Sequence, residues 1–331
     1  MSRPNLFHFA TSELSQDAVL CWLAEWAKPE YSETDPQLHQ LGKEFLRLLL
    51  MNHGQELLPQ TIKSFEIKRQ HRNIDVLIVL NGTVAICIED KVGSFEHSEQ
   101  LERYVATLRE EGFVEDNIVP VYVQTGEQSS YKAAEDAGYS IVRRAELITL
   151  LSRSVTGNDS IARDFHDYLS DVEQSVRAYN TIPFAEWDWY AWQGFYSEIQ
   201  SLLEEGDWGY VPNPRGGFVG FWWHWKNVGD SKQYLQLEQP VLCFKIFVDD
   251  KEKRREMRSE WSERILSVAE DSSLKVARPR RFGTGKSMTV AFLEGEYREL
   301  TPSGLLDISG TLNVLRQAED ILDRATRDST R

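Results

Sequence analysis

The chain has 331 residues, 41% of them hydrophobic and 27% charged, a composition typical of a globular protein with about two domains. No apolar run approaches the roughly 18 residues that a membrane-spanning helix needs, and the N-terminus lacks a signal-peptide pattern, so we expect a cytoplasmic protein without a membrane partner. The net charge of −15 disfavours indiscriminate nucleic-acid binding, but it is −12 over residues 1–175 and only −3 over residues 176–331. A local acidic excess also suits a divalent cation, so the charge alone decides nothing.

The first 175 residues predict an α/β domain with a mixed sheet. Asn81-Gly82, between two strand patterns, is a strong signal for a hairpin. The order of elements is typical of an α/β sandwich. Periodicity predicts helices over 15–27, 39–54, 98–111, 130–138 and 145–153, and strands over 64–72, 73–81, 83–91, 117–125 and 139–144.

Residues 176–331 have a different composition, and we predict a separate α+β domain there. Between Phe184 and Trp225, 14 of 42 residues are aromatic, including seven of the ten tryptophans. We interpret this run as core, with base stacking as the alternative. The predicted elements are strands over 218–225 and 234–248, a helix over 251–270, a hairpin over 281–293 and a last helix over 311–326.

The three cysteines indicate a reducing compartment. Cys21, Cys87 and Cys243 are far apart, odd in number, and each lies in an apolar run. We therefore predict buried free thiols rather than disulfides or a cysteine-bound metal.

One segment, "AICIEDK" (85–91), carries a buried strand straight into three charges. Side chains alternate along a strand, so Glu89 and Lys91 share one face while Asp90 points to the other. Asp75 stands alone inside the apolar strand "NIDVLIVL", and buried charges are costly unless they are paired or bind a metal. A hairpin would bring Asp75 and Glu89 together, and such hard oxygen ligands suit Mg²⁺ or Mn²⁺. An ordinary ion pair between Glu89 and Lys91 is the alternative.

The register of this hairpin tests the metal site. A two-residue turn at Asn81-Gly82 would pair Asp75 with Ile88 and put Glu89 on the opposite face. Two carboxylates that share a cation must lie on one face. We therefore predict a loop of odd length, or a bulge, that brings Asp75 and Glu89 to the same face.

The Asp75…Glu89-x-Lys91 pattern, set in an α-β-β-β-α-β order, resembles the active site of the PD-(D/E)XK nuclease superfamily. Gln100 and Tyr104 reproduce the Q-x-x-x-Y element of its helicase-associated exonuclease branch. Roughly residues 10–150 resemble uncharacterised bacterial PD-(D/E)XK families with a long C-terminal region. The resemblance implies a restriction-endonuclease-like αβββαβ core with a mixed sheet in residues 1–175, followed by an α+β C-terminal domain in residues 176–331.

The same resemblance implies roles for individual residues. It makes Asp75 and Glu89 metal ligands, Lys91 the catalytic lysine, and Gln100 and Tyr104 further residues of the catalytic site. The backbone carbonyl of Asp90 would face the metal. Ile74 replaces the superfamily's proline before the first aspartate. For the carboxylate that such sites take from a helix we choose Glu44, with Glu13 as the rival.

The implied function is a Mg²⁺- or Mn²⁺-dependent nuclease that hydrolyses phosphodiester bonds of nucleic acid, DNA in preference to RNA, in a restriction or phage-defence role. A catalytically silent nuclease fold that binds nucleic acid or protein is the alternative from another class. A phosphate-binding loop at "FGTGKS" (282–287) is disfavoured, because Arg280 replaces its first glycine and a strand-like segment follows. Basic clusters at 251–258 and 278–281 are candidates for nucleic-acid contacts. The sequence leaves open whether the chain forms a homo-oligomer or joins a partner subunit.

Overall fold

The computed structural model of the protein describes residues 4–51, 53, 58–93, 98–153, 159–213 and 216–327. The chain divides into two compact units, Met1–Gln174 and Ser175–Arg331. None of the described helices is both long and apolar enough to cross a membrane.

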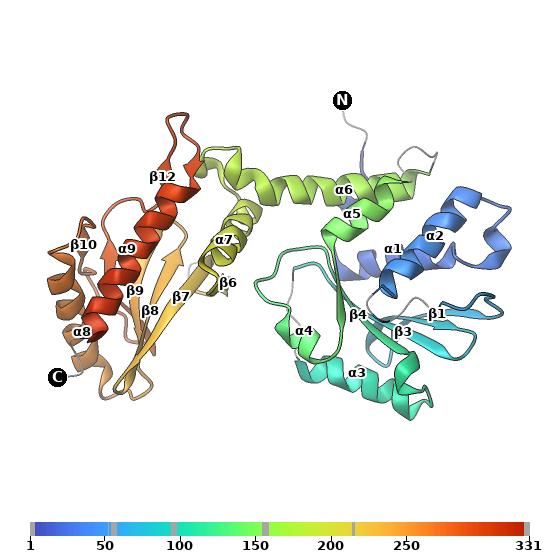
Figure 1. Ribbon diagram of the computed structural model, residues 1–331, viewed down its shortest axis with the longest axis horizontal. Coiled ribbons are helices and arrows are strands. Elements are labelled where there is room, and N and C mark those ends of the chain that lie inside the picture. The colour runs from blue at the N-terminus through green and yellow to red at the C-terminus, as the bar shows by residue number, and fades with distance from the viewer. Residues whose placement is uncertain are drawn as a thin grey trace. The chain divides into compact units, whose positions relative to one another are not determined.

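The first unit is built on a five-stranded mixed sheet with the strand order β1-β2-β3-β4-β5 (Figure 1). The first three strands pair antiparallel, and the pairs β3–β4 and β4–β5 are parallel. This is the mixed sheet expected of a restriction-endonuclease-like core. The strands are β1 (Phe65–His71), β2 (Ile74–Leu80), β3 (Val84–Lys91), β4 (Ile118–Gln124) and β5 (Ser140–Arg143).

Helices cover both faces of this sheet (Figure 1). On one face, apolar side chains of β2, β3 and β4 pack against α1, α2, α5 and α6, and on the other face they pack against α3 and α4. The burial of both faces explains why β3 and β4 are buried along their whole length. The helices are α1 (Glu13–Glu25), α2 (Pro36–Leu49), α3 (Ser98–Glu110), α4 (Lys132–Asp136), α5 (Arg144–Ser152) and α6 (Ser160–Arg177), with short 3₁₀ turns at Leu6–His8, Pro29–Tyr31 and Glu115–Asn117.

Local signals fix where the first two helices begin. Ser12 caps α1, because its side chain accepts from the backbone N–H of Ser15. Asp35 caps α2 and Pro36 occupies its first turn, so α2 begins three residues before the predicted start at 39. A Cβ at Gly42 of α2 would lie 2.6 Å from the backbone nitrogen of Ala27. The glycine therefore allows α2 to lie close against the end of α1.

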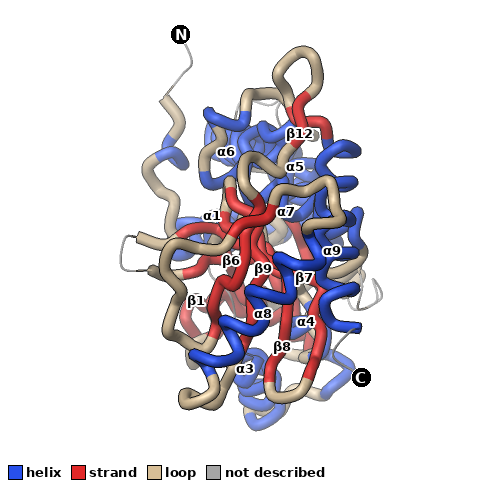
Figure 2. Tube along the Cα trace, turned by 90° about the vertical axis from the view of Figure 1, so that its left-hand side faces the viewer, coloured by secondary structure: helices blue, strands red, loops and turns tan. Residues whose placement is uncertain are grey.

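The second unit has a six-stranded antiparallel sheet with the strand order β10-β11-β9-β8-β7-β6. Figure 2 shows α8 in front of the strands, and side chains of both α8 and α9 pack into the core on this sheet. A small β12–β13 pair precedes α9. The bounds are α7 (Trp189–Leu203), β6 (Asp207–Val211), β7 (Phe218–Val228), β8 (Ser231–Glu238), β9 (Val241–Phe247), α8 (Arg254–Ala269), β10 (Val276–Ala277), β11 (Ser287–Leu293), β12 (Glu299–Leu300), β13 (Leu306–Asp307) and α9 (Ile308–Arg327), with 3₁₀ turns at Ala178–Asn180 and Phe184–Glu186.

The aromatic run forms the core of this second unit. Trp187, Trp192, Trp208 and Trp223 are buried with α7, α8 and α9 on the sheet, which supports the interpretation as core. Trp225 is 46% exposed and stacks on Tyr234 at 4.0 Å between ring centres.

The "FGTGKS" segment is not a nucleotide-binding loop. It leads directly into strand β11, whereas a phosphate-binding loop opens a helix. Arg254 and Arg258 of α8 hold this loop by donating to the carbonyl oxygens of Thr284 and Gly283.

Candidate active site

The hairpin between β2 and β3 closes with a three-residue loop, Asn81 to Thr83. Leu80 pairs with Val84, and the register continues without a shift to Val76 opposite Ile88. One step further, Asp75 lies opposite Glu89 on the same face of the sheet. Asn81 and Gly82 both have left-handed φ angles, 53° and 66°, which Asn and Gly adopt at low cost. The prediction of an odd-length loop is confirmed.

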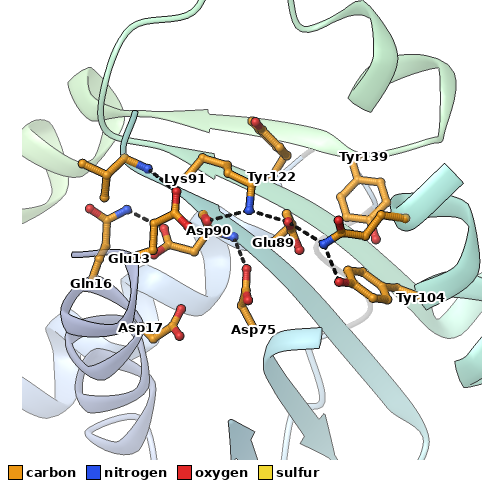
Figure 3. Close-up of polar contacts among 12 residues, drawn as sticks. Glu13, Gln16, Asp17, Asp75, Glu89, Asp90, Lys91, Tyr104, Tyr122 and Tyr139 are labelled. Atoms are coloured by element: carbon orange, nitrogen blue, oxygen red, sulfur yellow. Dashed lines mark hydrogen bonds and ion pairs between the residues drawn. The ribbon is translucent and has the colours of Figure 1, made fainter. Parts of the chain in front are cut away.

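Glu89 lies at the centre of a cluster of polar side chains near the C-terminal end of β3 (Figure 3). Its side chain is fully buried, and its Oε1 accepts from Lys91 Nζ at 2.5 Å and from Gln100 Nε2 at 3.3 Å. Its Oε2 is also buried and has no hydrogen-bond partner among the described residues. A buried carboxylate oxygen without a partner is costly, so this position favours a cation or a proton.

The cluster has an excess of negative charge. Burial and the nearby charge of Asp75 raise the pKa of Glu89 to about 7, although Lys91 acts in the opposite direction. Burial would lower the pKa of Lys91, but its hydrogen bond to Glu89 and the charges of Glu89 and Glu13 raise it. Lys91 therefore remains an ammonium, and one ammonium does not neutralise the carboxylates around it.

Asp75 is held from two sides. Its Oδ2 accepts from the backbone N–H of Asp90 at 3.0 Å, and its Oδ1 accepts from Gln70 Nε2 at 3.1 Å. Gln70 has a left-handed φ of 52° within β1, and the same amide nitrogen also donates to Asp17 at 3.2 Å. Gln70 therefore links the carboxylates of β2 and α1.

The Q-x-x-x-Y pair lies in the cluster, as the resemblance implies. Gln100 Nε2 contacts both Glu89 and the hydroxyl oxygen of Tyr104, the latter at 2.5 Å. Both residues belong to α3, where a spacing of four places them on one face of the helix. Gln100 therefore orients the Glu89 carboxylate. His97, which precedes this helix, lies outside the described residues.

The structure brings Glu13, the rival candidate, to the cluster, whereas Glu44 makes its contacts elsewhere. Glu44 lies on α2, where it accepts from Gln40 at 2.9 Å and pairs with Arg153 at 2.8 Å. Glu13 opens α1, and its Oε1 accepts from the backbone N–H of Val92 at 3.4 Å, just beyond Lys91 (Figure 3). The packing of α1 against the strands brings its first turn, rather than the middle of α2, to the end of β3.

The backbone carbonyl and the side chain of Asp90 face in different directions. Its backbone carbonyl accepts from Lys91 Nζ at 3.2 Å, so the carbonyl faces the cluster as expected. Its side chain is fully buried on the opposite face and accepts from Gln16 Nε2. Gln16 in turn accepts from Thr125 Oγ1 at 2.6 Å. Burial raises the pKa of the Asp90 carboxyl well above its ordinary value.

Sequence reasoning missed Gln16, Asp17 and Gln124. Glu13, Gln16 and Asp17 have the i, i+3, i+4 spacing of one helix face, and this polar stripe in an apolar helix was the available signal. The parallel pairing of β3 with β4 places Gln124 beside Lys91. Its amide is fully buried, and neither its nitrogen nor its oxygen has a hydrogen-bond partner among the described residues.

The residues of the cluster fit a hard divalent cation. Mg²⁺ is commonly bound through one or two carboxylates, with water and substrate phosphate as its other ligands. Asp75 and Glu89 supply two carboxylates, and the orphaned Oε2 of Glu89 supplies a free oxygen. Lys91 adds a cationic donor on the same face.

Comparison with known proteins supports this assignment. A sequence model of the PD-(D/E)XK nuclease superfamily matches residues 4–192, more than half of the chain. No curated protein and no solved structure matches the chain. The protein belongs to the PD-(D/E)XK nuclease superfamily.

Proposed function

We propose that the protein is a Mg²⁺-dependent nuclease that hydrolyses phosphodiester bonds of nucleic acid at Asp75, Glu89 and Lys91. The observation that supports this most strongly is the register of the β2–β3 hairpin, which puts both carboxylates and the lysine on one face. A structural ion pair needs only Glu89 and Lys91. The additional Asp75, together with the unpartnered Glu89 Oε2, favours a metal site over a simple pair.

Asp75 and Glu89 would hold the cation, with Glu13 as a further carboxylate near Lys91. When bound, the cation supplies charge stabilisation at a phosphoryl oxygen and lowers the pKa of water. Lys91 stays protonated beside Glu89, and its Nζ can hold the attacking water or a phosphate oxygen. Gln100 fixes the orientation of Glu89, so the carboxylate is positioned before substrate binds.

We propose DNA in preference to RNA as the substrate, and a restriction or phage-defence role. Membership of the superfamily supports nucleic acid as the partner, and the smaller acidic excess of residues 176–331 supports that half as the contact. Arg280 and Arg281 are the best candidates for phosphate contacts, because both are exposed in the turn before β11. Cys21, Cys87 and Cys243 are all free thiols, which supports a reducing compartment such as the cytoplasm.

The direct test is incubation of the purified protein with mixed DNA and RNA substrates in Mg²⁺, in Mn²⁺ and in EDTA. Cleavage in either metal that is lost in EDTA is the expected result. A catalytically silent fold would cleave nothing in any condition. Calorimetric titration with Mg²⁺ distinguishes the two further, since a silent fold has no need of a metal site.

A further inference from the structure

A histidine in the second unit is held in an unusual backbone conformation. The pairing of β7 with β8 shifts between Trp223 and Lys226, which marks a β-bulge. His224 lies within it and has a left-handed φ of 56°, a conformation that is uncommon outside glycine but that histidine, like asparagine and aspartate, adopts more often than other residues. Bulges redirect side chains, and this one turns His224 towards Asp323 of α9.

The two ring nitrogens of His224 face different carboxylates. Nε2 lies 2.8 Å from Asp323 Oδ1, and Nδ1 lies 3.4 Å from Glu205 Oε1. A neutral imidazole carries only one N–H, and the shorter contact assigns it to Nε2. The lone pair of Nδ1 then points at the carboxylate of Glu205. That arrangement is repulsive unless a cation or a second proton lies between them.

Glu319 of α9 completes the group. One ligand atom from each of Glu205, His224 and Glu319 lies within 4.8 Å of the other two. The indole N–H of buried Trp223 donates to Glu319 Oε1 at 2.7 Å and fixes this carboxylate. The three side chains come from the loop before β6, from β7 and from α9, so the fold itself assembles them.

We propose that Glu205, His224 and Glu319 form a second metal site, suited to Zn²⁺, that is separate from the residues of the nuclease centre. Asp323 is a positioning residue, because it orients His224 from the ring nitrogen that does not face the metal. Imidazole and carboxylate ligands together suit Zn²⁺ better than Mg²⁺.

The geometry and the charge both fit this assignment. Two ligands about 2.0–2.1 Å from one tetrahedral zinc ion are roughly 3.3 Å apart. The separation of His224 Nδ1 and Glu205 Oε1, 3.4 Å, is close to that value. Lys226 pairs with Asp323 at 2.7 Å, and no described lysine or arginine pairs with Glu205 or Glu319. Two uncompensated carboxylates match the charge of one divalent cation.

The contact between His224 and Asp323 also follows the pattern of metal-binding histidines. Such residues almost always donate their other ring N–H to a carboxylate or carbonyl, which fixes the tautomer and ring orientation. Solvent can reach the group, because the side chain of Glu205 is 44% exposed while that of His224 is 14% exposed. If His224 only fastened the bulge to α9, then Asp323 would suffice and the carboxylate of Glu205 beside Nδ1 would be dispensable.

The test is calorimetric titration of Zn²⁺ into the full chain in excess Mg²⁺. Every protein compared carries Asp75→Asn and Glu89→Gln, so that these two carboxylates of the nuclease centre do not bind the added metal. We expect about one equivalent of Zn²⁺, bound about 100-fold more weakly in Glu205→Gln and in His224→Asn. Asparagine is chosen because it tolerates a left-handed backbone. Glu205 is exposed, so its variant keeps the fold. Asp323→Asn should weaken binding by about 10- to 100-fold.

His166→Ala is the matched control, because His166 also lies beside a carboxylate, Asp167 at 3.2 Å, but outside this group. Zn²⁺ affinity should be unchanged in this variant. The proposal is overturned if the parent protein binds no Zn²⁺, or if Glu205→Gln and His224→Asn bind it as tightly as the parent. Neither result bears on the nuclease centre, since Asp75 and Glu89 are replaced in all the proteins compared.

Discussion

Asp75 accepts a hydrogen bond of 3.0 Å from the backbone N–H of Asp90, so the carboxylate of β2 is tied to the strand that carries Glu89 and Lys91. This contact needs a register in which Asp75 faces Glu89, and the three-residue loop at Asn81–Thr83 provides it. The shape of one turn therefore decides whether the two carboxylates can share a cation.

Replacement of Glu13 tests whether this residue contributes to the site together with Asp75 and Glu89. Glu13→Gln should lower cleavage by about 10- to 100-fold, because it removes a charge near Lys91 while keeping the hydrogen-bond acceptor for Val92. Glu44→Gln is the matched control and should cleave at the wild-type rate, since Glu44 pairs with Arg153. Initial rates at saturating Mg²⁺ measure both. Equal loss in the two variants would contradict the placement of Glu13.

Gln100 and Tyr104 should differ in their effect on the metal. Gln100→Leu removes the amide that holds Glu89, so we expect the Mg²⁺ concentration for half-maximal cleavage to rise by about 10-fold. Tyr104→Phe removes only a partner of Gln100 and should change this value less. Metal titrations of the cleavage rate give both numbers. A larger effect of Tyr104→Phe than of Gln100→Leu would contradict the assignment of Gln100 as the residue that holds Glu89.

Asp17 should make the stability of the metal-free protein depend on pH. Burial and the charge of Asp75 raise its pKa from 3.8 to about 6, so the folded protein favours the protonated form. This contribution to stability is present below about pH 4 and is lost as the pH rises through 6. Asp17→Asn should therefore raise the free energy of unfolding by roughly 1–2 kcal/mol at pH 8 in EDTA, with no gain near pH 4.

Urea unfolding at the two pH values measures this difference. Asp116→Asn, at an exposed position of the same unit, controls for the loss of one negative charge. An equal gain for Asp17→Asn at both pH values would show that the substitution acts through packing and not through the proton.

The basic turn before β11 should contribute to nucleic-acid affinity. Arg280→Gln with Arg281→Gln should weaken binding and reduce the slope of log affinity against log salt by about 2 for duplex DNA, because two phosphate contacts are lost. Fluorescence anisotropy in EDTA, across a series of salt concentrations, measures the slope without cleavage. Arg254 and Arg258 are poor choices for this test, since both hold carbonyls of the 282–286 loop. An unchanged slope would assign the contact to another surface, with the "KRQHR" segment (68–72) as the next candidate.

The strands and their charges could be predicted because the pattern that carries them is local. Asp75 and Glu89 stand out as charges in strands that are otherwise apolar, and Asn81-Gly82 marks the hairpin between them. The odd length of the hairpin loop also followed from chemistry, since a two-residue turn without a bulge would put Asp75 and Glu89 on opposite faces, where they cannot share a cation. The Q-x-x-x-Y pair lies on one helix turn, and its spacing alone puts both side chains together.

The choice between Glu13 and Glu44 could not be made from the sequence. It depends on how α1 and α2 cross the sheet, which is set by packing such as the close approach of Gly42 to the backbone of Ala27. Gln124 was missed for a similar reason, because its position beside Lys91 arises from the parallel pairing of strands far apart in the chain. The β-bulge at His224 could not be predicted from the sequence, since "FWWHW" contains no glycine or asparagine to mark a left-handed backbone conformation.

The most direct measurement of the central claim is the rate of nucleic-acid cleavage in Mg²⁺ by the wild-type protein, by Glu89→Gln and by Lys91→Met, with Glu44→Gln as the control. Wild type and control should cleave equally, and each site variant should lose roughly 10³-fold or more, because each removes a charge at the reacting phosphate. Circular dichroism would confirm that all four proteins are folded. Cleavage by folded Glu89→Gln at the wild-type rate would contradict the assignment of this cluster as the nuclease centre.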